Sequence, residues 1–291
     1  MTRKTGKRGR EPFSRKRLPS PFYAPRKRFG QHFLEPAWVE KVTRAIAPKP
    51  DEVFLEIGPG RGALTRALTA AAARVVAFEI DRDLASALRE TAPPNLTIET
   101  GDFLNAPLST LNSRLTTFDS RLRVAGNLPY NVASPILFKL IELYAAGLPL
   151  TDATVMLQRE VADRLTAAPG TRDYGVLAVL IGHRAQVERV LALPPGAFRP
   201  PPKVRSALVR LQFHPPHPPP KDESLFAAMV QAVFTRRRKM LANALLAFHA
   251  TSRLRPAEAL GRAGIDGSRR PETLSIDELV RLADVFATGS P

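Results

Sequence analysis

The stretch Val53–Gly62, which reads VFLEIGPGRG, decides the expected fold of this 291-residue chain. Its first five residues are an apolar run of the kind found in buried strands, and residues 63–73 have helical spacing. A strand, a glycine-rich turn and a helix in this order open a Rossmann-like unit, whose turn holds a phosphate or carboxylate group. The turn lacks the spacing of the dinucleotide fingerprint G-x-G-x-x-G. That departure disfavours an NAD oxidoreductase and suits a cofactor without a pyrophosphate.

Acidic residues follow the next two predicted strands. Residues 74–78 form a strand that ends in Glu79, about 20 residues after the first glycine, where a ribose-binding carboxylate is expected. Residues 96–99 form another strand, followed by Asp102, which can accept a hydrogen bond from an adenine amine, and Phe103, which can pack on the ring. The alternatives are a surface acid at Glu79 and an ordinary turn at Asp102.

The tetrapeptide Asn127-Leu128-Pro129-Tyr130 lies between a predicted strand at 121–125 and a predicted helix at 133–144. The Asn127 side-chain oxygen and a nearby carbonyl can accept hydrogen bonds from an exocyclic amine, and the Tyr130 ring can stack on the base. By itself the tetrapeptide is equally compatible with an ordinary strand-to-helix turn. Because ligands of open α/β sheets bind at the carboxyl ends of the strands, four strand ends are expected to form one site. They contribute Gly58, Glu79, Asp102 and Asn127.

The bulk composition restricts the class of protein. The net charge of +16 and the pI near 10.9 favour a polyanionic partner, most simply nucleic acid. The absence of cysteine excludes disulfides and thiolate metal sites, and the five histidines form no ligand-spaced cluster, so no metal is expected. No apolar run is long enough to span a membrane, and the N-terminus lacks the apolar segment of a secretory signal. We therefore expect a cytoplasmic protein with no membrane association.

The chain divides at compositional boundaries. Residues 1–28 contain eleven Lys or Arg and one acid, and we expect a disordered basic arm that binds nucleic acid, with a solvated tail as the alternative. A globular domain at 29–214 precedes a Pro-rich linker at 215–220. Residues 221–291 are expected to form a small all-α domain that binds RNA through Arg236, Arg237, Arg238 and Lys239.

Periodicity predicts the remaining elements. Further helices are expected at 36–47, 84–90, 158–165, 175–182, 225–234, 240–248, 256–264 and 276–286, and further strands at 153–157, 186–193 and 204–213. The prolines of the segment 198–204 stiffen it, and this segment could hold Phe198 and Lys203 near the ligand-binding edge, where Lys203 is a further expected RNA-binding residue.

The motifs together resemble one family, the small-subunit ribosomal RNA adenine dimethyltransferases. The resemblance runs from about Lys27 to the C-terminus. The family often has Asn where this chain has His32. The matching segments are Phe29–Leu34, Glu56–Gly60, Glu79, Gly101-Asp102, Asn127–Tyr130, Met156–Glu160, Phe198–Val204, Arg237–Lys239 and Leu274-Ser275.

The resemblance implies a fold, an activity and a set of roles. The fold is an α/β, Rossmann-like methyltransferase sheet of seven strands at 29–214 with a small all-α C-terminal domain. The activity is S-adenosylmethionine-dependent dimethylation of N6 on two adjacent adenines near the 3′ end of small-subunit rRNA, by a monomer that acts in small-subunit biogenesis. The implied catalytic residues are Asn127, Leu128, Pro129, Tyr130 and Phe198. The implied cofactor-binding residues are Gln31, His32, Leu34, Gly58, Gly60, Glu79, Ile80, Asp102, Phe103 and Asn127.

Other functions remain open from the sequence. A resistance-type large-subunit rRNA adenine methyltransferase shares the catalytic motifs, although Arg236–Lys239 and Leu274–Glu278 favour the small-subunit enzyme. An organellar transcription factor that kept the fold would be expected to have an altered site. A non-catalytic ribosome assembly factor would bind immature particles without transferring methyl groups.

Overall fold

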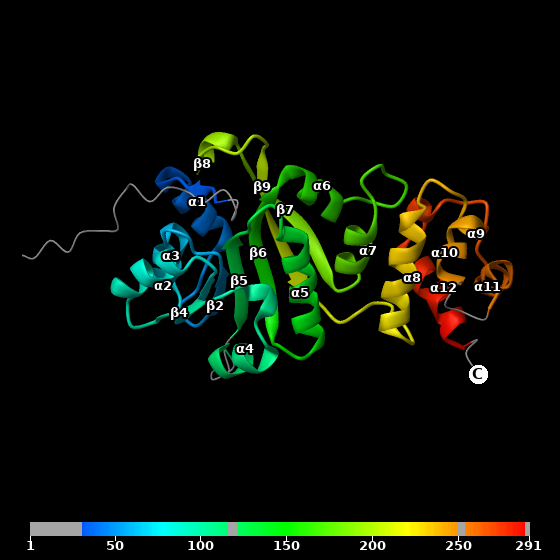
Figure 1. Cartoon of the computed structure of the whole chain (residues 1–291), viewed down its shortest axis with the longest axis horizontal. Helices are drawn as coiled ribbons and strands as arrows, with labels where there is room; N and C mark the ends of the chain where they lie inside the picture. Colours follow the sequence, from blue (N-terminus) through cyan, green and yellow to red (C-terminus); the bar gives the residue numbers. More distant parts are fainter. Residues whose placement is uncertain (1–30, 116–120, 250–253, 289–291) are drawn as a thin grey trace, which may run out of the picture.

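The computed structural model describes residues 31–115, 121–249 and 254–288, so the basic arm predicted at 1–28 lies outside the described residues. A seven-stranded sheet forms its centre, in the order β4-β3-β2-β5-β6-β9-β7 (Figure 1). A two-stranded sheet pairs β1 with β8. The strands are β1 (Phe33–Leu34), β2 (Val53–Ile57), β3 (Arg74–Glu79), β4 (Leu96–Thr100), β5 (Leu122–Asn127), β6 (Leu150–Gln158), β7 (Ala185–Leu193), β8 (Phe198–Arg199) and β9 (Ser206–Phe213).

Helices cover both faces of the large sheet and form the C-terminal end of the molecule (Figure 1). They are α1 (Pro36–Ile46), α2 (Ala63–Ala71), α3 (Arg82–Glu90), α4 (Leu108–Leu115), α5 (Ala133–Ala145), α6 (Arg159–Leu165), α7 (Val176–Gly182), α8 (Glu223–Thr235), α9 (Leu241–Ala244), α10 (Leu246–His249), α11 (Pro256–Ala263) and α12 (Ile276–Thr288). Single 3₁₀ turns lie at Phe103–Asn105, Pro195–Ala197 and Pro271–Thr273. Within the described residues, no helix is both long and apolar enough to cross a membrane.

The strand order places the ligand-binding edge beside β2. Strands β2 to β6 are parallel to one another. Strands β3 and β4 lie on one side of β2, and β5 and β6 lie on its other side. The chain therefore reverses its order between β2 and β5, which is the switch point where open α/β sheets bind ligands. Strand β9 lies between β6 and β7 and pairs antiparallel with both, so it runs opposite to the other six strands of this sheet.

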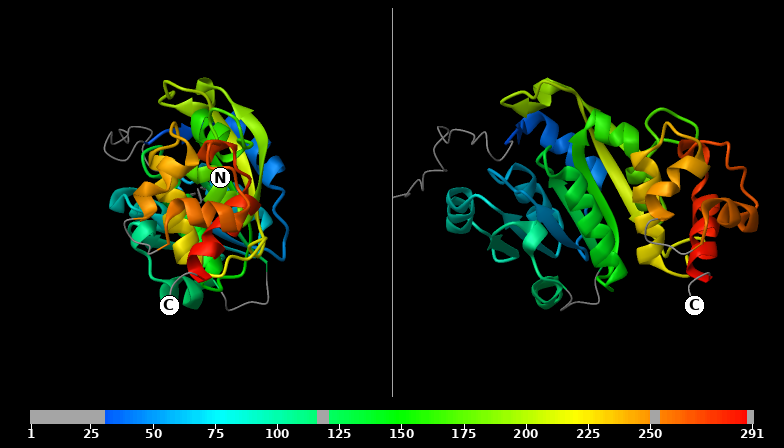
Figure 2. Two further views of the ribbon diagram at one scale, coloured as in Figure 1. Left: turned by 90° about the vertical axis from the view of Figure 1, so that its right-hand side faces the viewer. Right: turned by 45° about the vertical axis from the view of Figure 1, so that its right-hand side comes forward.

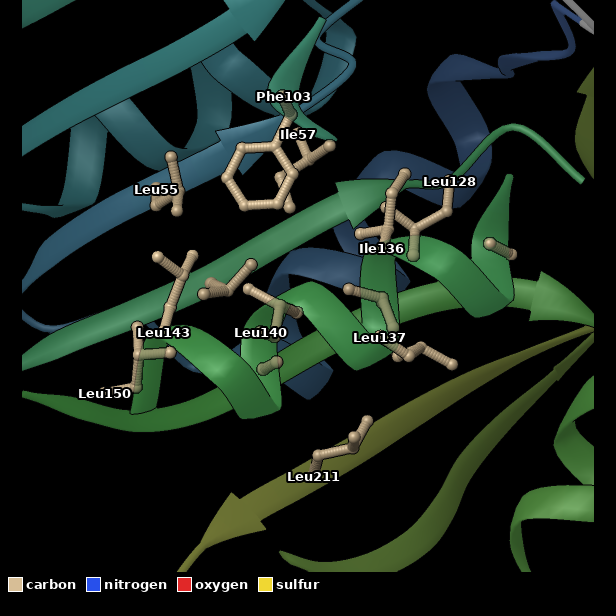
Figure 3. Packing of buried hydrophobic residues seen from close by; sticks show 14 of the residues in the cluster. Leu55, Ile57, Phe103, Leu128, Ile136, Leu137, Leu140, Leu143, Leu150 and Leu211 are labelled. Atoms are coloured by element: carbon tan, nitrogen blue, oxygen red, sulfur yellow. The ribbon is translucent and has the colours of Figure 1, made fainter. Parts of the chain in front are cut away.

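Side chains alternate between the two faces along each strand, so the sheet has a hydrophobic core on each face. On β2, Val53, Leu55 and Ile57 point to the face covered by α4, α5 and α6, where Leu137 and Leu140 of α5 pack above the sheet (Figure 3). The even-numbered side chain of Phe54 points to the opposite face, which α1 and α2 cover. A period of two on each strand thus explains why the sheet is buried on both sides.

One buried ion cluster lies on the α1 face. The guanidinium of Arg123 binds both carboxylate oxygens of Asp152 at 2.8 Å and one oxygen of Glu52 at 2.8 Å. Its remaining N–H groups donate to the carbonyls of Ile46 and Ala47 at the end of α1. The cluster therefore attaches the C-terminal end of α1 to the centre of the sheet.

The C-terminal helices share a core with α7 and lie at one end of the long axis (Figures 1 and 2). Ala178 and Val179 of α7, with Tyr174 just before it, are buried in the cluster that α8, α9, α11 and α12 form, whereas Ile181 of α7 faces the core of the large sheet. Helix α7 thus belongs to both halves of the molecule.

The predicted fold is confirmed, with differences in detail. The single helix expected at 240–248 is two short helices, α9 and α10, separated at Leu245. The first N–H groups of α9 donate to the carbonyls of Arg269 and Gly267. The pattern did not predict β1, β8 or α4, and α3 begins two residues before its predicted start at 84.

Candidate functional site

A cavity of about 310 Å³ lies at the carboxyl ends of β2, β3, β4 and β5. Every residue predicted to bind the cofactor lines it, as do the last residue of β5 and the three residues that follow. These residues are Gln31, His32, Leu34, Gly58, Gly60, Glu79, Ile80, Asp102, Phe103, Asn127, Leu128, Pro129 and Tyr130. The structure therefore brings together segments that lie up to about 100 residues apart in the sequence.

The glycine-rich turn forms the floor of the cavity. Gly58, Gly60 and Gly62 all have positive φ angles, a conformation that glycine adopts without steric cost. A Cβ atom added to Gly60 would lie 3.0 Å from the ring of Phe33, so a side chain there would press against the first motif. The turn can therefore approach a ligand closely with its backbone.

Glu79 is held in place by backbone donors. Its two carboxylate oxygens accept hydrogen bonds from Gly60 N–H and Asp81 N–H, each at 2.9 Å. The side chain is 4% exposed, and burial raises the pKa of this carboxyl despite the two donors. Each oxygen retains acceptor capacity toward the cavity, which suits a diol such as ribose.

Glu56 also lines the cavity, and the sequence did not single out its side chain as a site residue. It is 1% exposed, and its Oε2 has no hydrogen-bond partner. Burial raises the pKa of Glu56 to about 8, and the nearby Thr65 hydroxyl and the charge of Arg66 only partly oppose this. A buried carboxyl with an unpaired oxygen suits a cationic group bound in the cavity. In the sequence, Glu56 is an acid within an apolar strand pattern, and nothing in that pattern marks it as a site residue.

The amide of Asn127 is oriented by the first motif. Its Nδ2 donates to the carbonyl of His32 at 2.5 Å, so Oδ1 is left to accept a hydrogen bond from another group. The ring of Tyr130 stacks on the ring of His32, with 5.3 Å between centroids and 27° between planes. The Tyr130 hydroxyl contacts Ser206 Oγ at 2.7 Å, and burial raises the pKa of this phenol.

The segment Gln31–Glu35 lies across the site and is fixed to the strand pair formed with β8. Phe33 and Leu34 pair with Arg199 and Phe198, and Glu35 forms a 2.6 Å ion pair with Arg199. His32 Nδ1 lies 2.7 Å from the carbonyl of Pro200. The first motif, the loop after β5 and the proline-rich segment are therefore parts of one assembly.

The side of the cavity at β4 is apolar with one carboxylate. Phe103 is buried edge-on against Phe78, with centroids 5.8 Å apart, and Ile80 is 43% exposed. Asp102 accepts a hydrogen bond from Leu104 N–H at 3.0 Å, so it caps the short turn that follows. The turn that was the alternative for Asp102 is thus present, on a residue that also lines the cavity.

Phe198 lies elsewhere than its implied role requires. Its ring is 1% exposed and packs with Leu34, Leu193 and Met156 in the core on the α1 face, and it does not line the cavity. The pairing of β8 with β1 explains this position, because Phe198 faces inward opposite Leu34. Lys203 is exposed in the connection between β8 and β9 and also lies outside the cavity lining.

The basic cluster after α8 contains residues of two kinds. Arg236, Arg238 and Lys239 are exposed. Arg237 is engaged within the protein, because its Nε donates to Glu272 at 3.2 Å and its Nη2 donates to the carbonyl of Arg172 at 2.6 Å. Three of the four predicted RNA-binding residues of this cluster are therefore presented to solvent.

Comparisons with known proteins agree with this geometry. A family model described as "Ribosomal RNA adenine dimethylase" matches residues 24–288. The chain is 42% identical over 267 residues to Ribosomal RNA small subunit methyltransferase A of Pseudomonas fluorescens, covering 90% of this chain and 94% of the relative. It is 43% identical over 263 residues to the protein of the same name from Acinetobacter baylyi, covering 89% and 91%.

Solved structures share the fold. A dimethyladenosine transferase from Plasmodium falciparum aligns with a TM-score of 0.69 at 23% identity, covering 86% of this chain and 96% of that chain. The 23S rRNA methyltransferase ErmE aligns with a TM-score of 0.61 at 27% identity, covering 88% and 99%. The match of the family model to nearly the whole chain, together with relatives above 40% identity, confirms the resemblance carried by the motifs: the chain belongs to the ribosomal RNA adenine dimethylase family.

Proposed function

We propose that this protein uses S-adenosylmethionine to dimethylate N6 of two adjacent adenines near the 3′ end of small-subunit rRNA, in the cytoplasm and during small-subunit biogenesis. The single observation that supports this best is the orientation of the Asn127 amide at the end of β5. Its nitrogen is committed to the carbonyl of His32, which leaves its oxygen to accept from an exocyclic amine.

The chain's residues fit the cofactor. The positive-φ glycines let the backbone approach the methionine end, and the unpaired oxygen of buried Glu56 suits its cationic groups. Glu79 would accept from the ribose hydroxyls, and Phe103 and Ile80 would pack on the adenine while Asp102 accepts from its amine. When bound, S-adenosylmethionine supplies a methyl group on a sulfonium, which is a good leaving group.

The loop after β5 would prepare the target nitrogen. The N6 lone pair of adenine is delocalised into the ring, which makes it a poor nucleophile. Acceptance of its two protons by Asn127 Oδ1 and the Leu128 carbonyl would favour a pyramidal nitrogen with an available lone pair. Alignment then supplies most of the catalysis, and no strong general base is required because the proton can leave after the methyl group arrives.

Aromatic stacking would hold the target base outside its helix. Tyr130 is the ring at this position, and its contact with His32 on one side and Ser206 at its hydroxyl keeps it fixed. A fixed ring compensates part of the cost of removing a base from its stack. Phe198, a buried residue of β8, is not available for this role in the described arrangement.

The test is transfer of labelled methyl groups to small ribosomal subunits that lack methylation, with large subunits and free rRNA in parallel, followed by digestion to nucleosides. We expect N6,N6-dimethyladenosine from small subunits alone. Label on the large subunit would support the resistance-type enzyme, a rival that the 27% identity to ErmE keeps relevant. Tight binding to small subunits without label would support a non-catalytic assembly factor.

We further propose that the protein acts as a monomer. The residues assigned to the cofactor and to the target amine all line this one cavity, with Phe198 as the exception, so the proposed reaction requires no residue from a second copy. Sedimentation at micromolar concentration, in the presence and absence of the cofactor, would test this; a stable dimer would contradict it.

A further inference from the structure

A second, larger hollow lies beside the candidate active site. Its volume is about 880 Å³, and it shares no lining residue with the cofactor cavity. It begins at Ser134, four residues after Tyr130, and extends along α5 and α6 to the end of α8. We call this hollow the α5–α8 groove. Its lining residues are Ser134, Phe138, Glu160, Arg164, Arg172, Asp173, Gly175, Val176, Leu177, Phe234, Arg237 and Arg238.

The walls of the groove are fixed to one another. Arg237 at the end of α8 donates to the carbonyl of Arg172 on the opposite wall and forms an ion pair with Glu272. Gly170 N–H donates to the carbonyl of Glu272 at 2.7 Å, and Tyr174 packs edge-on against Phe234, with centroids 6.0 Å apart. The groove is therefore preformed, because both walls belong to one packed unit.

The floor of the groove is apolar and its rim is basic. Phe138, Val176, Leu177 and Phe234 supply apolar surface, and four arginines face two carboxylates. Glu160 is paired with Arg164, and Arg237 is paired with Glu272. Within the described parts of the chain, no carboxylate is within ion-pair distance of Arg172 or Arg238, both of which are exposed. Asp173 remains as a second acid on the rim.

We propose that the α5–α8 groove binds an unpaired nucleotide of the rRNA next to the target adenine. The base would lie on the floor at Phe138 and Leu177, and the adjoining phosphates would be bound by Arg172 and Arg238. The inference rests on the proposed function and names how that site selects its RNA. An aromatic and aliphatic floor beside unpaired guanidinium groups matches an exposed base and its phosphates, whereas the bases of an intact duplex are stacked and unavailable.

The experiment compares two double variants of equal net charge in the full-length protein. Arg172→Gln with Arg238→Gln removes the unpaired cations of the groove. Arg44→Gln with Arg262→Gln removes two exposed cations from α1 and α11, outside the groove. The probes are a fluorescein-labelled 12-nucleotide oligoadenylate and a blunt RNA duplex of the same length, each titrated at several salt concentrations.

We expect the groove variant to bind the single strand at least about tenfold more weakly and to reduce its salt slope by about 1.4, the value for two lost phosphate contacts. The control variant should change this slope much less, and the two variants should bind the duplex alike. The proposal would be overturned if both variants lost the same affinity for the single strand. It would also be overturned if the groove variant lost as much affinity for the duplex as for the single strand.

A third variant tests the floor. Phe138→Leu keeps an apolar side chain at a half-buried position but removes the stacking ring. This variant should bind the single strand several-fold more weakly, with an unchanged salt slope. Unchanged affinity for the single strand would show that no base stacks on Phe138. The binding assay requires no methyl transfer, so a protein that fails to methylate small subunits but shows these effects would refute the proposed function alone.

Discussion

Asn127 holds two groups at once. Its Nδ2 donates to the carbonyl of His32 in the first motif, and we propose that its Oδ1 accepts from the target amine. We expect Asn127→Ala to lower methyl transfer by at least about 100-fold, as the loss of one positioning group does in other enzymes. Cofactor affinity, measured by calorimetry, should change only a few-fold because the other cavity residues remain. The control is Asn243→Ala on the exposed side of α9. A folded Asn127→Ala protein that no longer binds the cofactor would contradict this assignment.

Glu56 gives the site a pH dependence. The folded pKa is raised from 4.5 to about 8, so the folded protein retains a proton that the unfolded chain has lost between these values. The free energy of unfolding should therefore contain a contribution that decreases as pH rises from about 4.5 to 8. A bound cation favours the ionised form, so cofactor affinity should increase with pH, by about tenfold per unit between pH 6 and 7.5. Calorimetry with Glu56→Gln should show a much smaller pH dependence; an unchanged slope would exclude Glu56 as its source.

Gly126 permits the close approach of the two strands at the switch point. A Cβ atom there would lie 2.5 Å from the carbonyl oxygen of Ile57, a backbone atom that cannot rotate away. We expect Gly126→Ala to destabilise the protein by about 2–3 kcal/mol, because β2 and β5 must separate. Gly196→Ala, where nothing lies within 4 Å of the added atom, should be neutral or stabilising by about 0.5 kcal/mol. Urea unfolding measures both; equal stabilities for the two variants would show that the strands adapt.

Which site residues were predictable depends on where their signal lies. Glu79, Asp102 and Asn127 each follow a strand with a clear apolar pattern, so their positions at one sheet edge follow from topology alone. The lining position of Glu56 was not predicted, because an acid inside a buried strand is recognisable only once its burial and missing partner are known. The inward orientation of Phe198 depends on the pairing of β8 with β1, and two-residue strands have no periodicity to detect.

At the scale of elements, the junction of α1 with the sheet depends on Arg123. This guanidinium satisfies Asp152, Glu52 and two carbonyls, so its removal leaves Glu52 with the 2.9 Å hydrogen bond from Lys49 N–H and Asp152 with the 3.7 Å contact from Arg210. We expect Arg123→Met to destabilise the protein by about 3–5 kcal/mol. Arg121→Met is the matched control, since its pair with Asp51 is exposed and should contribute less than about 1 kcal/mol. Chemical unfolding of both variants provides the measurement, and a loss below about 1 kcal/mol for Arg123→Met would mean that the cluster adds no net stability.

Element prediction worked where one periodicity continued for several turns. The helices α5 and α12 and the strands of the large sheet have uninterrupted patterns and were predicted within a few residues. The break between α9 and α10 could not be predicted, because Leu241, Ala244, Leu245 and Phe248 are buried at the spacing of one continuous helix. Contacts with the segment 267–269, distant in sequence, set where α9 begins.

At the scale of the whole molecule, the net charge and the shape of the surface both favour RNA binding. The net charge of +16 favours RNA, and the α5–α8 groove places unpaired arginines next to the loop that would hold the target base. The sequence predicted a basic RNA-binding surface from Arg236–Lys239. It could not predict Arg172, because that residue joins the surface only when the C-terminal helices pack against α7.

The shared helix α7 also sets what happens when the C-terminal part is removed. The boundary predicted at 215–220 suggests two separable domains, but Tyr174, Ala178 and Val179 have their neighbours on α8 and beyond. The junction further contains an ion pair between Arg184 and Glu223 and a 2.8 Å contact from His183 Nε2 to the carbonyl of Pro218. We expect a chain ending at Pro220 to expose the apolar face of α7, bind a hydrophobic dye and lose its cooperative thermal transition.

The matched control for this truncation removes the other end of the chain. Deletion of residues 1–26 should leave the thermal transition unchanged, because their basic composition with few large apolar residues predicts no part in a core, while the salt slope for RNA binding becomes shallower. Dye fluorescence and calorimetric unfolding, run on both truncations and the full chain, distinguish the two cases. If the chain ending at Pro220 unfolds as sharply and at the same temperature as the full protein, α7 does not require the C-terminal helices, and the groove walls would then belong to two independent units rather than to one.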